Sequence, residues 1–167
     1  KYKGLDILLE AFSDNRLQNQ NLKLIVAGEF YEDAKPYYDL INKYNLSESV
    51  IFATKFIEDS EVVNYFCAAD IIVQPYKNAT QSGVTQIAYH FEKPMLVTDV
   101  GGLKEIVPHN KAGYVCEPNA NDVTNCLIEF FSKGKELEFI EGVVKEKSKY
   151  SWHKMIANIK SLHKDLF

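Results

Sequence analysis

The residues with the clearest chemical potential stand at the start of a predicted helix near the middle of the chain. Gln81, Ser82 and Gly83 open an amphipathic segment, residues 82–91, after a buried apolar run. A helix that begins with small residues leaves backbone N–H groups free for an anion. Ser82 suits the N-cap, because its hydroxyl can accept a hydrogen bond from one of those groups. Two interpretations stay open: an anion site, or a helix that simply starts here.

This helix is expected to pack inward through four apolar side chains at helical spacing: Val84, Ile87, Ala88 and Phe91. Its other sides would carry Thr85, Gln86 and Tyr89. That orientation fixes which end of the helix points toward a ligand.

Other well-known chemical motifs are missing from the sequence. It contains no GxGxxG, GxxxxGK[ST], HExxH, DxD or GxSxG pattern. The four histidines lack metal-ligand spacing and are expected on the surface or at helix ends: His90, His109, His153 and His163. The three cysteines show no CxxC pattern and are expected to be buried free thiols: Cys67, Cys116 and Cys126. We therefore expect no bound metal, no cofactor and no nucleophilic triad.

The bulk composition excludes several classes of function. The chain has 167 residues, of which 46% are hydrophobic and 25% charged, as in a globular domain with its own core. A net charge of −4 offers no basic stripe for nucleic acid. No apolar run reaches the roughly 20 residues that span a bilayer. We expect one cytoplasmic domain.

Apolar runs of strand length alternate with helical patterns along the whole chain. The expected strands lie within residues 22–30, 49–56, 70–76, 94–100 and 113–117, and the expected helices within 4–12, 34–45, 60–69, 82–91, 121–133, 136–150 and 150–167. Continuous apolar strands separated by helices indicate an α/β fold, a Rossmann-like doubly wound parallel sheet. The last helix is expected to pack through Trp152, Ile156, Ile159 and Leu162.

The chain opens on a loop and a helix, whereas folds of this kind open on a central strand. We expect a fragment that lacks its first strand, and a gap filled by another chain, by rearrangement or by upstream residues. Ligands of such sheets bind at the carboxyl ends of the strands. The expected strand ends include Lys55, Phe56 and Ile57, and the turn that leads to Ser82.

Several blocks in this order resemble the C-terminal half of family-4, GT-B-fold retaining glycosyltransferases (glycosyl transferase group 1). The blocks are YKGLDILLEAF, LKLIVAG, AADIIVQP, EKPMLVTDVGGLKEIV and GYVCEPNANDV. The resemblance covers essentially the whole chain. It implies one donor-binding domain, residues 1–167, with the N-terminal acceptor domain absent.

The resemblance assigns roles to individual residues. Lys3 matches a lysine that neutralises the donor diphosphate, and Lys55, Phe56 and Ile57 match the loop along the nucleobase. The residues that match the phosphate and sugar contacts are Gln81, Ser82, Gly83 and Val84, with Gln86 also on the rim. Catalytic residues are not assigned. The family's two glutamates are replaced by uncharged residues here, which leaves open a subfamily with glutamine, an altered donor or lost activity.

The implied function is binding of a nucleotide-diphosphate sugar for transfer to an acceptor, without a metal. The fragment alone is expected to be inactive, because the acceptor site lies in the missing domain. Alternatives are a non-catalytic domain, a GT-B-type epimerase, and a receiver-type or flavodoxin-like domain. Expected partners are the nucleotide sugar and the N-terminal domain, with a membrane-surface acceptor and peripheral attachment to the inner face of the membrane left open.

Overall fold

Five short strands, all paired in parallel, form the centre of the protein. The computed structural model describes residues 2–166, without the side chains of residues 152 and 164–166. The strands are β1 (Leu24–Ala27), β2 (Val50–Ala53), β3 (Ile72–Gln74), β4 (Met95–Thr98) and β5 (Gly113–Cys116). Each lies inside an apolar run that the sequence marks as a strand. The predicted parallel α/β architecture is confirmed.

The strands form two sheets rather than one. β1 pairs with β2 in the first sheet, and the second has the order β3–β4–β5. Among residues 2–166 no strand joins β1 to β3, and a doubly wound order places its first strand there. The break therefore falls where the sequence predicts a missing strand.

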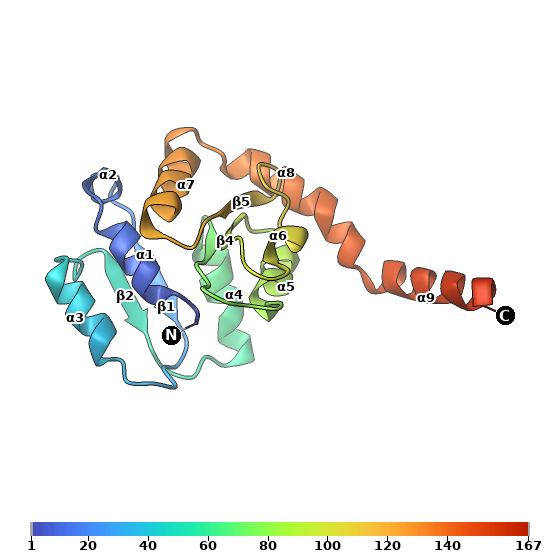
Figure 1. The fold of residues 1–167 in the computed structure, drawn as a ribbon, viewed down its shortest axis with the longest axis horizontal. Coiled ribbons are helices and arrows are strands. Elements are labelled where there is room, and N and C mark those ends of the chain that lie inside the picture. Colours follow the sequence, from blue (N-terminus) through green and yellow to red (C-terminus); the bar gives the residue numbers. More distant parts are fainter. Residues whose placement is uncertain (1, 167) are drawn as a thin grey trace.

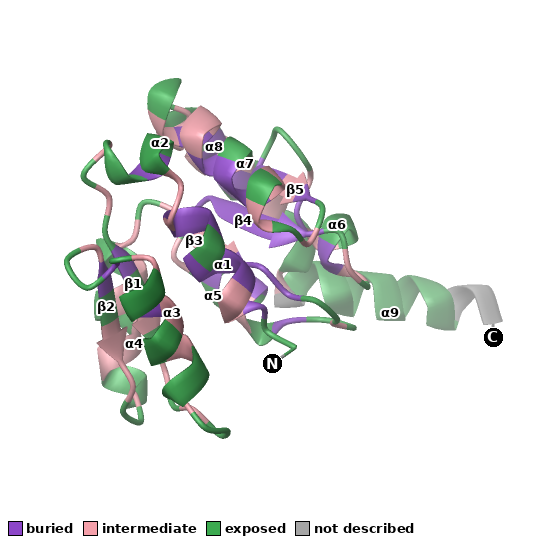
Figure 2. Ribbon diagram, turned by 60° about the vertical axis from the view of Figure 1, so that its left-hand side comes forward, coloured by how far each residue is buried: buried purple, intermediate pink, exposed green. Residues whose placement is uncertain are grey.

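Helices cover both faces of the second sheet (Figures 1 and 2). Neighbouring residues of β4 point to opposite faces, because side chains alternate along a strand. Leu96 packs into a core with α1 (Leu5–Phe12) and α7 (Ala120–Ser132). Met95 and Val97 pack into a second core with α5 (Gly83–His90), α6 (Leu103–Ile106) and α8 (Glu136–Lys147). The remaining helices are α2 (Asn15–Gln18), α3 (Lys35–Lys43), α4 (Asp59–Ala68), the 3₁₀ turn η1 (Ser148–Tyr150) and α9 (Trp152–Leu166).

The first sheet is covered less completely. Leu24 and Val50 are buried in the core with α1 and α3, but Ile25 and Ile51, on the other face, are 42% and 50% exposed. None of the residues of α4, all of which the structure describes, is buried. The first sheet, β1–β2, therefore has one face that is partly exposed to solvent.

The buried stripe of α5 differs from the prediction. Thr85, Ala88 and Tyr89 are buried, whereas Ile87 is 36% exposed. Two polar side chains are buried because backbone carbonyls satisfy them: Thr85 Oγ1 donates to Ser82 O at 2.5 Å and Tyr89 O–H donates to Ile106 O at 2.6 Å. Such hydrogen bonds cannot be predicted from the spacing of apolar residues alone.

The C-terminal helix is correctly predicted, but its packed face is not. Figure 1 shows α9 extending away from the rest of the molecule. Ile156, Ile159 and Leu162 are 46%, 56% and 62% exposed. The exposed fractions agree with the expectation that part of the apolar stripe is exposed. The predicted contact of Trp152 involves a side chain outside the described set.

Two further sequence predictions can be compared with the structure. Cys116 is buried and Cys126 partly buried, but Cys67 is exposed on α4, so its predicted burial is wrong. All three are free thiols. Across residues 2–166 no helix combines the length and apolarity needed to cross a bilayer.

Candidate functional site

The first turn of α5 begins at a serine N-cap and leaves space around Gly83. Ser82 has an extended backbone (φ −137°, ψ 126°), and its Oγ accepts the N–H of Val84 at 3.2 Å. Its Oγ also lies 3.3 Å from the hydroxyl of Tyr76. Gly83 is exposed, and apart from its chain neighbours and the backbone of its own helix no described heavy atom lies within 4 Å of where a Cβ would stand. A group with negative charge can therefore approach the first turn closely.

The loop that leads into α5 is fixed by neighbouring strand ends. Thr98 Oγ1, at the end of β4, donates to Tyr76 O at 2.6 Å. The following turn approaches even more closely: a Cβ on Gly101 would lie 1.7 Å from Ala79 O, and Gly101 has φ +52°. Only glycine fits such a position without displacing backbone. The turn after β4 thus packs directly against the loop that leads into α5.

The N-terminal loop lies against the same region. Lys77 N–H donates to Tyr2 O at 2.8 Å, and the rings of Tyr2 and Tyr76 meet edge to face at 6.1 Å. Gly4, at φ +66°, passes so close to Pro75 O that a Cβ would lie 1.8 Å away. Lys3 sits between these contacts, is exposed and forms no ion pair with any described residue. The structure therefore places Lys3 on the loop that contacts residues 75–77.

The predicted base loop lies on the other sheet. Lys55, Phe56 and Ile57 follow the carboxyl end of β2. Lys55 Nζ forms an ion pair with Glu61 at 2.9 Å, and this bond raises the pKa of Lys55. The ring of Phe56 is 62% exposed and Ile57 is partly buried. Lys55 is therefore occupied by a protein carboxylate, while Phe56 offers a free aromatic face.

The predicted site residues thus fall into two groups. Gln81, Gly83 and Gln86 are exposed on the loop and first turns of α5, with Val84 half-buried beside them. Lys3 joins this group through the N-terminal loop, whereas residues 55–57 lie across the gap between the sheets. Both groups are at carboxyl ends of parallel strands, the edge where ligands of such sheets bind.

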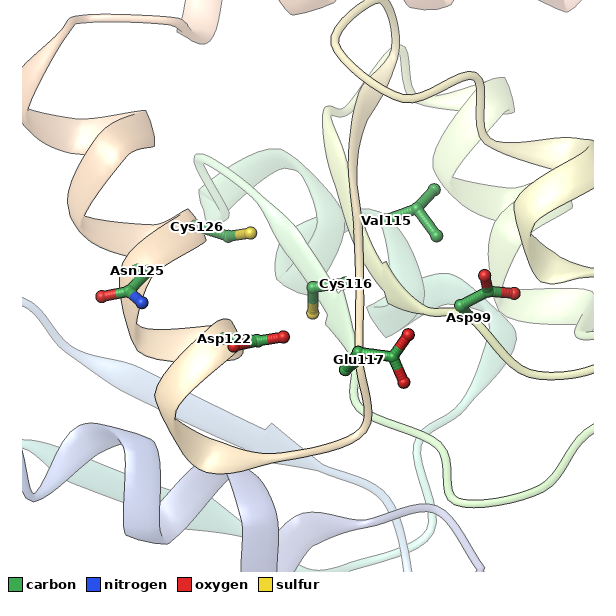
Figure 3. Close-up of a pocket in the computed structure, with 7 residues that line it drawn as sticks. All are labelled: Asp99, Val115, Cys116, Glu117, Asp122, Asn125 and Cys126. Atoms are coloured by element: carbon green, nitrogen blue, oxygen red, sulfur yellow. The ribbon is translucent and has the colours of Figure 1, made fainter.

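A pocket at the ends of β4 and β5 was not predicted from the sequence. It has a volume of about 350 Å³ and is lined by Asp99, Val115, Cys116, Glu117, Asp122, Asn125 and Cys126 (Figure 3). The strand-end rule already reaches Asp99, at the end of the run 94–100, but it was not extended to Glu117 at the end of the run 113–117. Within the described chain no cluster of three or more His, Cys, Asp or Glu side chains could hold a metal ion.

A family profile described as "Glycosyl transferases group 1" matches residues 1–141. The chain belongs to this family. Among its curated relatives is an uncharacterised glycosyltransferase of Methanocaldococcus jannaschii, 29% identical over 98% of this chain and 45% of the relative. Another is the lipopolysaccharide 1,2-N-acetylglucosaminetransferase of Salmonella typhimurium, 26% identical over 99% of this chain and 46% of the relative. The group 1 chain thus spans less than half the length of either.

Solved structures share the fold of this group 1 domain. Anabaena HepE, in a crystal structure with UDP, superposes with a TM-score of 0.83 at 17% identity, over 98% of this chain and 46% of HepE. HepE has also been solved with UDP-glucose, and that structure gives a TM-score of 0.80. This chain therefore has the fold of one half of a GT-B glycosyltransferase.

Proposed function

We propose that this group 1 domain binds the nucleotide-diphosphate sugar donor of a retaining, family-4 glycosyltransferase. The observation that carries the proposal is the open first turn of α5, with exposed Gly83, beside the loop that bears Lys3. A helix N-terminus and a lysine without an ion pair among the described residues suit a diphosphate. Because HepE is known with UDP and UDP-glucose, UDP is the first nucleotide to test.

The chemistry follows from the charge that develops when the bond between sugar and diphosphate breaks. The leaving diphosphate gains negative charge, and fixed donors aimed at it lower the barrier. The backbone N–H groups of Gly83 and Val84 and the ammonium of Lys3 are the donors in this proposal. They would do this work without a metal. Gln81 and Gln86 would bind hydroxyl groups of the sugar or ribose, since amides both donate and accept.

The acceptor belongs to the N-terminal domain of a longer protein in this proposal. The chain alone would bind donor without transferring sugar, and hexosyl transfer would need both domains. The longer protein would act in polysaccharide biosynthesis, on an acceptor at the cytoplasmic surface of a membrane. Residues 55–57 would lie along the base, with the exposed ring of Phe56 available for contact.

A second candidate is a domain that binds the nucleotide sugar but does not transfer it, or acts as a GT-B-type epimerase. The observation behind it is local: the rim residues Thr80, Gln81, Gln86 and Ile87 carry no charge. The family's glutamates would stand in this segment. Product analysis with UDP-sugars separates the two: a glycosylated acceptor supports transfer, whereas an epimerised or unchanged sugar supports the alternative.

The direct test is calorimetric titration of the full-length protein with UDP and the other nucleoside diphosphates. Lys3→Ala should weaken binding by about ten- to a hundred-fold, since a hydrogen bond to a charged group contributes about 1.5–3 kcal/mol. Lys23→Ala is the matched control, because Lys23 precedes β1 at the opposite end of the strands and bonds Glu48 O. Equal affinities for wild type, Lys3→Ala and Lys23→Ala would refute the site.

A further inference from the structure

Tyr76 contacts both parts of the candidate phosphate site. It follows β3, is only 8% exposed and lies in the second core, which α5 also enters. Its hydroxyl lies 3.3 Å from Ser82 Oγ, at the N-cap of α5. Its ring meets the ring of Tyr2 edge to face, and Tyr2 precedes Lys3 in the chain. One buried side chain therefore touches the start of the helix and the N-terminal loop.

The backbone around Tyr76 is fixed by bonds that do not involve its hydroxyl. Its carbonyl accepts a hydrogen bond of 2.6 Å from Thr98 Oγ1 at the end of β4. The next residue, Lys77, donates its backbone N–H to Tyr2 O at 2.8 Å and forms an ion pair with Asp6. The place of the phenol is therefore set by the backbone and the core, and a phenylalanine would keep it.

The hydroxyl of Ser82 can be oriented in two ways. A serine hydroxyl donates one proton and accepts at two positions. Ser82 Oγ accepts the N–H of Val84 at 3.2 Å, and the Tyr76 hydroxyl is its second partner. No other described residue bonds to Ser82 Oγ. At the contact between the two hydroxyls, either Tyr76 or Ser82 can therefore be the donor.

An anion at the first turn of α5 would favour one of these two arrangements. If Tyr76 donates, both accepting positions of Ser82 Oγ are occupied, and the serine proton points to a third partner. The oxygens of an ionised phosphate accept hydrogen bonds, and bonds to charged acceptors are the stronger ones. If Ser82 donates to Tyr76 instead, it has no proton left for the phosphate. Because Ser82 is only 9% exposed, few water molecules compete for that proton.

We propose that Tyr76 is a positioning residue of the donor site, which turns the hydroxyl proton of Ser82 toward the diphosphate. The hydrogen bonds run from the Tyr76 O–H to Ser82 Oγ, and from the Ser82 O–H to a phosphate oxygen. Each proton stays on its own oxygen, and no covalent bond changes. The inference rests on the donor-binding function proposed above. It adds the Ser82 hydroxyl to the donors of that proposal, beside the backbone N–H of Gly83 and the ammonium of Lys3.

Removal of the phenol hydroxyl tests the proposal. Tyr76→Phe in the full-length protein keeps the ring and its contact with Tyr2 but no longer orients Ser82. The affinity for UDP should fall about three- to tenfold, the range expected for one hydrogen bond between neutral groups. Inorganic pyrophosphate should lose affinity by the same factor, because it carries no base. Ser82→Ala should lose at least as much, and Ser82→Thr should restore binding because threonine keeps the hydroxyl. Calorimetric titration measures each affinity.

A double variant separates proton orientation from a general loss of structure. Once Ser82→Ala is present, Tyr76→Phe should change the affinity by no more than about twofold, because no serine proton is left to orient. Tyr89→Phe is the matched control, since it removes another phenol hydroxyl from the same core, one that donates to Ile106 O at 2.6 Å. Its affinity for UDP and pyrophosphate should equal that of wild type, whatever its free energy of unfolding in urea.

The inference is wrong if Tyr76→Phe binds UDP and pyrophosphate as tightly as wild type. It is also wrong if Tyr76→Phe costs the same affinity with and without Ser82→Ala, or if Tyr89→Phe loses as much as Tyr76→Phe. In those cases wild type still binds, so the donor-binding function stands. A wild-type protein that binds no nucleoside diphosphate would instead overturn both proposals.

Discussion

The backbone N–H of Gly102 donates a hydrogen bond of 3.0 Å to the carbonyl of Thr80. This bond joins the turn after β4 to the loop that leads into α5. The preceding glycine, Gly101, leaves no room for a side chain at the same contact. The shape of the candidate phosphate site therefore depends on a turn some twenty residues further along the chain, and this dependence can be tested.

Replacing Gly101 by alanine should destabilise the protein strongly. The new Cβ would lie 1.7 Å from Ala79 O, and the residue has φ +52°. Gly134→Ala is a matched control, since Gly134 has φ +59° but, its chain neighbours aside, no described heavy atom within 4 Å of its Cβ position. The control should lose about 1–2 kcal/mol for its backbone conformation alone, and Gly101→Ala a further ~1–3 kcal/mol for the clash. Equal free energies of unfolding in urea would contradict this account.

Gly83→Val should weaken nucleotide binding while leaving the fold intact. The position has open space around its Cβ and a φ that any residue adopts, so valine fits the protein. It would, however, stand where the diphosphate approaches the first turn of α5. We expect a loss of affinity of about tenfold or more, equal to about 1.4 kcal/mol, with Gly83→Ala between valine and wild type. Calorimetric titration alongside urea unfolding checks both parts. An unchanged affinity for valine would move the phosphate site elsewhere.

Stability should fall at high pH in part through Tyr114. Burial, aided by nearby carboxylates, raises the pKa of Tyr114 to about 12 from 10.0. The unfolded chain loses this proton at lower pH than the folded chain, so the stabilisation is fully present below pH 10 and is lost as pH rises toward 12. In Tyr114→Phe, the free energy of unfolding should fall less between these two pH values. Tyr31→Phe, at a side chain that is 91% exposed, should behave as wild type. The free energy of unfolding in urea, measured from pH 9 up to the highest pH at which the protein still folds, tests this prediction.

The helices and strands could be predicted from the sequence because the patterns that specify them are local. Each strand is a short apolar run, and Ser82 was recognised as an N-cap from its type and place. The face of α5 was misjudged because Thr85 and Tyr89 are buried through hydrogen bonds to backbone carbonyls. Apolar spacing does not contain that information.

Contacts between distant residues were also beyond sequence reasoning. The ion pair of Lys77 with Asp6 and the bond from Lys77 N–H to Tyr2 O link segments about seventy residues apart. The pocket that Cys116 and Cys126 both line likewise depends on how β5 packs against α7. Resemblance to the family named Lys3 and the α5 turn as candidates, but their contacts with the ligand stay predictions.

The gap between β1 and β3 can be tested one amide at a time. In a parallel pair, alternate N–H groups of a strand point to opposite neighbours. Leu24 and Gly28 donate to Ser49 and Ala53 of the β2 side, and Ile72 donates to Pro94 beside β4. By this alternation the N–H groups of Ile25, Ala27 and Val73 face the open edges.

We predict that a strand supplied by upstream residues, or by another chain, protects these edge amides. Amides without a hydrogen-bonded partner exchange quickly, and paired ones exchange slowly through opening events. In this chain alone, Ile25, Ala27 and Val73 should therefore exchange much faster than their neighbours Val26 and Gln74, which point to existing strands. In a longer form of the protein, or with an added strand peptide, the three edge amides should slow to the rates of those neighbours. Hydrogen–deuterium exchange followed by NMR resolves each position. Fast exchange at all three edges in the longer form would mean that the gap stays open, and the missing-strand interpretation would then be wrong.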